Sequence, residues 1–329
     1  MKKISLGVLG VSNHFIKRVV LPAQQLANID LKAIASRSEL KAREYAKAFE
    51  IPHSYGDYQS LLDSSDIDAV YIPLPNHMHA EWIKKAADAN KHILCEKPLS
   101  MSADEAKMVV EYCQTKGVYL MEAFMYKYHP QWQTVQNIIR TNNIGKISYI
   151  NTSFSYNNPS PKNIRNIKEY GGGGLRDIGC YAISVSRYLI GKEPCQVVSQ
   201  INEHPEFGTD ELSSAILDFG NCKATFTVGT SFSAFQKVDI IGTAGHISVH
   251  LPFNTYADVP AKVTVVTAIG QREISFPPAN QYGLMIQAFA DDILDQKQVS
   301  LVEDDAILNQ KVIDAVQRSA DSGRWETID

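Results

Sequence analysis

Alternation between short apolar runs and segments with helical spacing dominates the first 123 residues and constrains the fold more than any other feature of the chain. Each apolar run except the last is followed by a helical segment. The expected strands are 4–9, 31–35, 69–72, 92–95 and 119–123, and the expected helices are 19–26, 40–49, 77–89 and 103–116. Ser102 and Glu105 are spaced as a capping box at the start of the last of these helices. Strands that alternate with helices form a parallel sheet with helices on both faces. We therefore predict an α/β domain built on a doubly wound parallel sheet.

The pattern changes after Pro130, where a helical segment leads into runs with period-two alternation. In one such run Ala224, Phe226 and Val228 fall on one face, and polar residues fall on the other. This alternation is typical of an antiparallel sheet with one buried face. We predict that the second half is an α+β domain with a mostly antiparallel sheet.

The domain boundary is expected near Phe124, which gives domains of residues 1–123 and 124–329. A chain of 329 residues with 44% hydrophobic residues can bury two ordinary cores. Helical patterns at 282–294 and 304–319 close the chain, and we expect that these helices can pack back on the first domain.

Charge and cysteine content favour a small-molecule partner and a reducing compartment. The net charge is -4 with both signs interspersed, so no basic stripe is present for nucleic acid or an acidic membrane surface. The odd number of scattered cysteines indicates neither a disulfide framework nor a metal site. No apolar run has the length of a signal peptide core or a membrane span, so we expect a cytoplasmic protein.

Gly10 follows the first expected strand, at the place where a dinucleotide-binding fold has its glycine-rich turn. Ser12 and Phe15 stand where the usual fingerprint has its second and third glycines. We expect Gly10, Ser12, Asn13 and His14 to line a coenzyme. The alternative is an ordinary glycine turn between a strand and a helix.

Ser36 and Arg37 follow the second expected strand, where an NAD site usually has an acidic residue for the ribose 2′-hydroxyl. A guanidinium there can form charge-assisted hydrogen bonds to a 2′-phosphate, which favours NADP(H) over NAD(H). Ser38 can cap the next helix, and Arg37 can alternatively be solvated.

A rigid turn into a helix follows the third expected strand and would lie beside the nicotinamide end of a coenzyme. The residues of this turn with an expected coenzyme contact are Pro73, Leu74, Pro75, Asn76 and His79. His77 and His79 also suggest a metal site, but their side chains diverge and no further ligand stands at a suitable spacing. Asn76 as a helix cap and His79 as a polar contact explain the segment better, and we predict no metal.

Glu96 and Lys97 stand directly before Pro98, just past the apolar run 92–95. Ligands bind outside the carboxyl ends of strands in a doubly wound sheet, so this cation and carboxylate are placed for chemistry. The alternative interpretation is an ion pair that closes a strand.

Four glycines at 171–174 open a helical pattern that carries Asp177 and Tyr181. The spacing of four residues puts this carboxylate and this phenol on one helix face, so both can converge on one ligand. The glycines allow close approach of the backbone, which favours a ligand site over a solvated face.

Together these motifs resemble the glucose-fructose oxidoreductase, inositol dehydrogenase and rhizopine-catabolism oxidoreductase (Gfo/Idh/MocA) family, and the resemblance covers essentially the whole chain. The matching segments are Gly10, 73–76 with His79, 96–98, 121–126 with 129–131, 163–166, 171–181 and 242–245. The resemblance implies a Rossmann domain followed by a substrate domain whose large open sheet joins subunits, so a homodimer or homotetramer is expected.

The resemblance also implies roles for single residues. Lys97 matches the family's lysine, and Tyr181 matches the tyrosine of the branch that contains sugar dehydrogenases, dihydrodiol dehydrogenases and deoxysugar ketoreductases. Arg165 is expected to face coenzyme or substrate, and Tyr126 and His129 are expected to contact substrate, the alternatives being a core aromatic and a capped histidine.

The expected function is an NADP(H)-dependent oxidoreductase that transfers a hydride to or from a secondary alcohol, ketone or anomeric carbon of a sugar or related cyclic diol (EC 1.1.1 or 1.3.1 type). A free phenol with a pKa of about 10 is a poor base, and the Lys97 ammonium would favour the phenolate of Tyr181. Asp177 would hold Lys97 or a second substrate hydroxyl. The alternative is a dinucleotide or sugar sensor with the same fold and no turnover.

Overall fold

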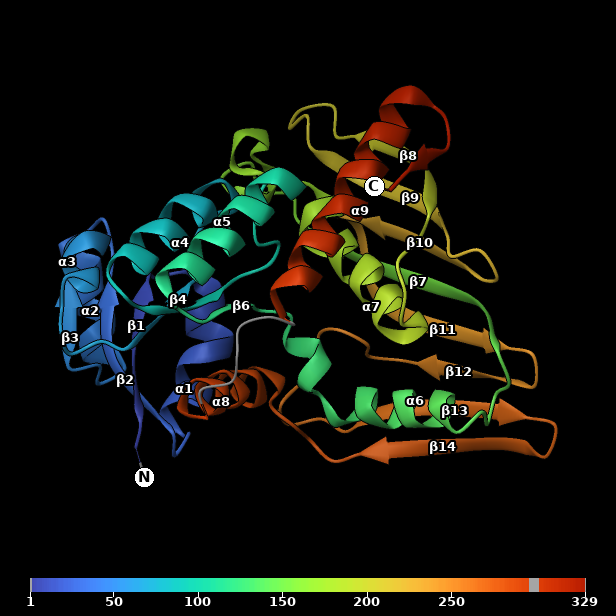
Figure 1. Ribbon diagram of the computed structural model, residues 1–329, viewed down its shortest axis with the longest axis horizontal. Coiled ribbons are helices and arrows are strands. Elements are labelled where there is room, and N and C mark those ends of the chain that lie inside the picture. The colour runs from blue at the N-terminus through green and yellow to red at the C-terminus, as the bar shows by residue number, and fades with distance from the viewer. Residues whose placement is uncertain (1, 296–301, 329) are drawn as a thin grey trace. The chain divides into compact units, whose positions relative to one another are not determined.

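The computed structural model describes residues 2–295 and 302–328 of the chain (Figure 1). By its internal contacts the chain divides into two compact units. The first comprises Met1–Met125 and Tyr282–Ile307, and the second comprises Tyr126–Gln281 and Leu308–Asp329.

A six-stranded parallel sheet forms the centre of the first unit, with the strand order β3-β2-β1-β4-β5-β6. Its strands are β1 (Ile4–Leu9), β2 (Ile29–Ala35), β3 (His53–Tyr55), β4 (Ala69–Ile72), β5 (His92–Cys95) and β6 (Leu120–Glu122). The strand order reverses at β1, whose neighbours β2 and β4 lead into crossovers in opposite directions, and ligands bind at such a point. The predicted doubly wound sheet is confirmed; β3 was not expected because its three residues carry no apolar pattern.

Helices cover both faces of this sheet. They are α1 (Val20–Gln24), α2 (Glu39–Ala48), α3 (Tyr58–Leu62), α4 (His79–Asp88), α5 (Ala103–Lys116) and α8 (Gln281–Leu294). In Figure 1, α4 and α5 lie on one side of the sheet and α1 and α8 on the other. The side chain of Asn28 donates to Asp291 of α8 at 2.7 Å, and the Tyr119 hydroxyl donates to Asp292 at 2.9 Å. Ser102 caps α5 as predicted, accepting from the Glu105 N–H.

A nine-stranded sheet forms the second unit, with the order β14-β13-β12-β11-β7-β10-β9-β8-β15. Only β7 and β10 pair in parallel, so the sheet is mostly antiparallel, as predicted. The strands are β7 (Ile147–Asn157), β8 (Gln196–Glu203), β9 (Asp210–Asp218), β10 (Lys223–Gly229), β11 (Ser231–Gly242), β12 (Gly245–Val249), β13 (Ala261–Thr267), β14 (Gly270–Phe276) and β15 (Glu326–Thr327).

Helices cover one face of the nine-stranded sheet, and none of the helices that the structure describes lies on the other face. The covering helices are α6 (Pro130–Arg140), α7 (Cys180–Ile190) and α9 (Val302–Ser322) (Figure 1). Ala224, Phe226 and Val228 are buried on the covered face, which confirms their predicted alternation. On the other face Thr225 donates a hydrogen bond to Asn151, and this face also exposes the large apolar side chains of Ile216 and Phe235.

In the part of the chain that the structure describes, we find no helix with both the length and the apolar character needed to span a membrane.

Candidate active site

The turn after β1 is shaped by Gly10, which has a φ of +125°, a conformation that other residues rarely adopt. A Cβ atom at Gly10 would lie 3.1 Å from a methyl group of Leu74, so glycine also leaves room here. The Ser12 hydroxyl accepts a hydrogen bond from the Phe15 N–H at 3.1 Å and organises the entry into a helix. The Phe15 ring is fully buried against Tyr71, so it fills the space that a third glycine would have left.

Two cations flank this turn. Arg37 hydrogen-bonds the hydroxyl of Tyr58, which would lie 4.0 Å from a Cβ atom at Gly10. Lys41 donates to the carbonyl oxygen of Val11 at 3.1 Å. Ser38 caps α2, as expected, by accepting from the Lys41 N–H. The motif search did not single out Lys41 or Tyr58, although the place of Lys41 one turn after the capping serine is a usable signal.

The donor set at this turn fits a phosphorylated dinucleotide. Because Gly10 has no Cβ atom, a dinucleotide can approach the backbone of this turn closely. Arg37 and Lys41 supply positive charge for a phosphate group. Ser36 is nearly buried and its hydroxyl accepts from the Ser38 N–H at 3.2 Å. The first acidic residue after β2 is Glu39, which is exposed and bonded to Arg43 at 2.5 Å.

Glu96 is held as an ionised carboxylate. Its Oε1 accepts from the Tyr71 hydroxyl at 2.6 Å and lies 3.3 Å from His14 Nε2. Burial opposes the charge, but His14, the Lys97 ammonium and the Tyr71 hydrogen bond outweigh it and lower the pKa of Glu96 to about 2. The structure thus brings His14, predicted with the Gly10 turn, to Glu96, which was predicted together with Lys97 as a separate motif.

His79 links the loops that follow β4 and β5. Its ring is fully buried, with Nε2 at 2.9 Å from the Leu74 carbonyl oxygen and Nδ1 at 2.9 Å from the Pro98 carbonyl oxygen. Burial lowers the pKa of His79, while the contacts with the Pro98 and Leu74 carbonyl oxygens oppose this shift. The polar contact expected for His79 is confirmed. The helix cap expected at Asn76 is wrong, because Asn76 opens a short 3₁₀ turn and α4 begins later, at His79 with Met78 at the cap position.

Other residues with an expected coenzyme contact lie in the loops that follow β1, β4 and β5. Pro73 and Leu74 are buried, Pro75 is half-buried, and Asn13 is exposed beside the Gly10 turn. Lys97 is half-buried at the end of β5.

Tyr181 lies in an aromatic cluster of the second unit. Only 6% of the residue is exposed, and its ring centroid lies 5.3 Å from Phe253, 5.9 Å from Tyr126 and 6.0 Å from Phe154. The hydroxyl of Tyr126 shares a hydrogen bond of 2.8 Å with Ser184, one turn after Tyr181 on α7. This packing limits the positions that the Tyr181 ring can take.

His129 caps α6: its Nδ1 accepts a hydrogen bond from the Gln131 N–H. The side chain is buried, and burial lowers its pKa to about 4. A contact between His129 and substrate stays a prediction.

Asp177 makes two strong contacts within the second unit. Arg165 Nε lies 2.9 Å from its Oδ1, and the Tyr156 hydroxyl donates to its Oδ2 at 2.5 Å. Burial, together with the charge of Asp177, raises the pKa of Tyr156 far above its ordinary value, so this phenol remains a donor. Sequence reasoning found Arg165 and Asp177 but missed Tyr156, which lies within a strand and matches no motif.

The glycine run lets other parts of the same unit approach closely. A Cβ atom at Gly172 would lie 2.4 Å from the Arg165 carbonyl oxygen, and the Gly173 N–H donates to that oxygen at 2.8 Å. A Cβ atom at Gly173 would fall 1.8 Å from Asp210 Oδ1. The run therefore holds the Arg165 loop against the start of the helix that carries Asp177.

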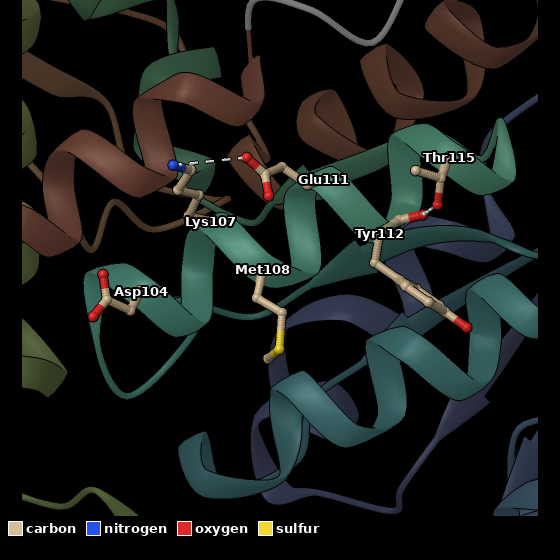
Figure 2. Close-up of a pocket in the computed structure, with 6 residues that line it drawn as sticks. All are labelled: Asp104, Lys107, Met108, Glu111, Tyr112 and Thr115. Atoms are coloured by element: carbon tan, nitrogen blue, oxygen red, sulfur yellow. Dashed lines mark hydrogen bonds and ion pairs between the residues drawn. The ribbon is translucent and has the colours of Figure 1, made fainter.

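A separate pocket of about 360 Å³ lies on the outer surface of α5 (Figure 2). Its lining comes from successive turns of that helix: Asp104, Lys107, Met108, Glu111, Tyr112 and Thr115. None of these is a predicted site residue. Among the residues 2–295 and 302–328, no group of three or more His, Cys, Asp or Glu side chains is arranged to hold a metal ion.

Comparison with known proteins shows that two family models match successive parts of the chain. Residues 4–124 match an oxidoreductase family with an NAD-binding Rossmann fold, and residues 132–248 match the Gfo/Idh/MocA C-terminal domain. D-xylose 1-dehydrogenase (NADP(+)) 2 of Haloferax volcanii is 34% identical over 98% of this chain and 99% of its own. The dTDP-3,4-didehydro-2,6-dideoxy-alpha-D-glucose 3-reductase of Saccharopolyspora spinosa is 32% identical over 97% of this chain and 95% of its own.

Among solved structures, a 3-ketoreductase of Actinomadura kijaniata in complex with NADP and TDP-benzene superposes with a TM-score of 0.91. It is 27% identical and the match covers 97% of this chain and 98% of that one. Variants of that enzyme with one tyrosine changed to phenylalanine or one lysine changed to alanine match as well.

Proposed function

The chain belongs to the Gfo/Idh/MocA family of oxidoreductases, and on that premise we propose that it is an NADP(H)-dependent dehydrogenase or reductase of a sugar, keto-sugar or related cyclic diol. The observation that carries the coenzyme assignment is that Lys41 bonds to the Gly10 turn at Val11 and that Arg37 bonds to Tyr58, whose hydroxyl lies next to Gly10. Two cations at that place suit a 2′-phosphate, and no acidic residue stands at the end of β2 to repel it.

Coenzyme binding would use Gly10, Ser36, Arg37 and Lys41 for the phosphorylated part, and the loops joined by His79 for the nicotinamide end. When bound, the nicotinamide supplies or accepts the hydride. The role of the chain is to place the substrate, exclude water and move one proton.

Tyr181 is the proposed proton-transfer group. In the reductive direction its hydroxyl gives a proton to the substrate carbonyl oxygen, and in the oxidative direction the phenolate takes a proton from the substrate hydroxyl. Its aromatic surroundings keep the ring in place and exclude water. Lys97 would favour the phenolate through its charge, and Asp177, oriented by Arg165, would hold a substrate hydroxyl.

The proposal is tested by fluorescence titration with NADPH and NADH, followed by turnover assays with aldoses, ketoses, dTDP-linked keto-sugars and dihydrodiols. We expect tighter NADPH binding and turnover of one of these substrate classes. Tyr181→Phe and Lys97→Met should each lower kcat by about 100-fold or more, since general acid-base catalysis contributes factors of that size, while NADPH still binds.

Tyr112→Phe and Lys107→Met are matched controls, because both side chains lie on the outer surface of α5, outside the proposed site. They should keep wild-type kcat. Full activity of Tyr181→Phe would remove Tyr181 from the mechanism, and tight NADPH binding without turnover of any substrate would favour a non-catalytic sensor.

The open face of the nine-stranded sheet is the proposed contact between two copies of the chain. Tyr149, Ile216 and Phe235 expose 40% to 54% of their area on three strands. Apolar groups of this size on a helix-free face are suited to a subunit interface. Sedimentation should show a homodimer or homotetramer, and Ile216→Lys should shift it toward monomer; a wild-type monomer would contradict the proposal.

A further inference from the structure

The helical segment that carries Asp177 and Tyr181 starts at a residue that cannot cap it. The segment opens with a π-helical turn, Leu175–Gly179, and continues as α7. Gly174 holds the cap position and has no side chain, so the first N–H groups need another acceptor. Asp210, the first residue of β9, supplies it: its Oδ2 accepts from the Leu175 N–H at 2.5 Å.

The carboxylate of Asp210 is held in one position. The Ser213 hydroxyl donates to the same Oδ2 at 2.7 Å, and Oδ1 fills the space that a side chain at Gly173 would need. Gly173 has a φ of +114°, so glycine is required both by the backbone conformation and by the carboxylate. The Asp210 side chain thus connects the start of β9 to the start of the helical segment that carries Asp177 and Tyr181.

Burial of the Asp210 carboxylate costs free energy, and this cost indicates that its contact with Leu175 is specific. Burial raises the pKa of Asp210 to about 6, although the bonds from Ser213 and Leu175 and the charge of Arg176 favour the ionised form. The charge of Asp210 also helps to raise the pKa of Tyr156, the phenol that donates to Asp177. Asp210 therefore acts on the Asp177 cluster through the backbone and through its charge.

We propose that Asp210 is a positioning residue for Asp177 and Tyr181: the hydrogen bond to Leu175 fixes the π-helical turn, which carries Asp177 and leads directly into α7, which carries Tyr181. The inference rests on the proposed function, since it assumes that Tyr181 transfers the proton. A small shift of the helix start would displace the Tyr181 hydroxyl, and misplacement by 1 Å can lower a rate by about 100-fold.

The test compares Asp210→Ala with Asp210→Asn, using the substrate and coenzyme that the wild-type protein turns over. Alanine removes the acceptor, and we expect kcat to fall about tenfold or more while the Kd for NADPH stays the same. Asparagine keeps an acceptor oxygen and should restore most of kcat. Amide hydrogen exchange at Leu175 should become faster in the alanine variant and stay slow in the asparagine variant.

Asp218→Asn is the matched control, because it makes the same change in the same strand, where Asp218 bonds to Lys223 and Gln196 outside the site. It should leave kcat and Leu175 exchange unchanged. If Asp210→Ala does not fold, Ser213→Ala replaces it, with an expected fall in kcat of about threefold and faster Leu175 exchange.

Unchanged kcat or unchanged Leu175 exchange in the variant that loses the hydrogen bond would overturn the inference, and so would an asparagine variant as slow as the alanine variant. These outcomes differ from failure of the proposed function, in which the wild-type protein itself turns over none of the substrates.

Discussion

His79 Nδ1 lies 2.9 Å from the carbonyl oxygen of Pro98, the residue directly after Lys97. The other ring nitrogen faces the Leu74 carbonyl oxygen, so one buried imidazole joins the two loops that are expected to hold the nicotinamide end of the coenzyme. The position of the Lys97 backbone therefore depends on a side chain that need not touch coenzyme or substrate.

Replacing His79 by alanine should destabilise the fold and slow the enzyme. The change leaves a cavity and at least one buried carbonyl without a donor, which costs about 2–4 kcal/mol of unfolding free energy. Urea denaturation measures this loss, and steady-state assays should show a lower kcat because Lys97 is less well fixed. His77→Ala is the control, since His77 is exposed two residues away; equal stability of both variants would contradict the assignment.

The fold could be read from sequence because its signals are local. The strand and helix periods and the Ser102 cap each depend on a few neighbouring residues, and all are present in the structure. The Gly242–Gly245 turn between β11 and β12 is likewise found where it was expected. The short strand β3 was not predicted, because it forms by pairing with β2 and its own three residues carry no strand pattern.

The NADP(H) assignment depends on Arg37 and Lys41. Arg37→Ala and Lys41→Ala should each weaken NADPH binding about tenfold, since a hydrogen bond between charged groups contributes about 1.5–3 kcal/mol. Binding of NADH, which lacks the 2′-phosphate, should change by much less. Arg43→Ala, on the same helix but paired with Glu39, is the control. Equal effects on NADPH and NADH would show that neither cation contacts the 2′-phosphate.

Tyr156 is expected to orient Asp177 for substrate binding. Tyr156→Phe removes the donor to Asp177 Oδ2 and leaves the ion pair with Arg165, so kcat/KM should fall by about tenfold, the effect of roughly 1.4 kcal/mol. NADPH affinity should not change. Tyr112→Phe likewise removes a phenol that donates to a carboxylate, that of Asp88 on the outer side of α5, and should have no effect. Wild-type kcat/KM in Tyr156→Phe would remove this role.

The supporting contacts of the site could not be read from sequence, because they join distant segments. Asp210 reaches Leu175 from 35 positions away, and Tyr156 reaches Asp177 from 21 positions away. Their residue types are common in strands and loops, and only the folded sheet brings them to the helix start. Motifs identify the groups proposed to carry the chemistry, whereas the groups that hold them depend on tertiary structure.

The pH dependence of stability should separate Asp210 from the other carboxylates. Folding raises its pKa from 3.8 to about 6, so between these values the folded state binds more protons than the unfolded state. Its contribution to stability is therefore present below about pH 4 and is lost as the pH rises through about 6. Asp210→Asn cannot ionise, so its melting temperature relative to wild type should rise between pH 4 and pH 7 and then level off.

Asp218→Asn should behave in the opposite way. Hydrogen bonds from Lys223 and Gln196 lower the pKa of Asp218 to about 2, so its contribution is present above pH 4 and is lost only as the pH falls through about 2. The asparagine variant should be less stable than wild type by an amount that is constant from pH 5 to pH 8. The charge of Arg176 and the hydrogen bonds from Ser213 and Leu175 oppose the effect of burial on the pKa of Asp210. A melting-temperature difference for Asp210→Asn that does not vary with pH would mean that Asp210 is already ionised at pH 4 in the folded protein, as an exposed carboxylate would be.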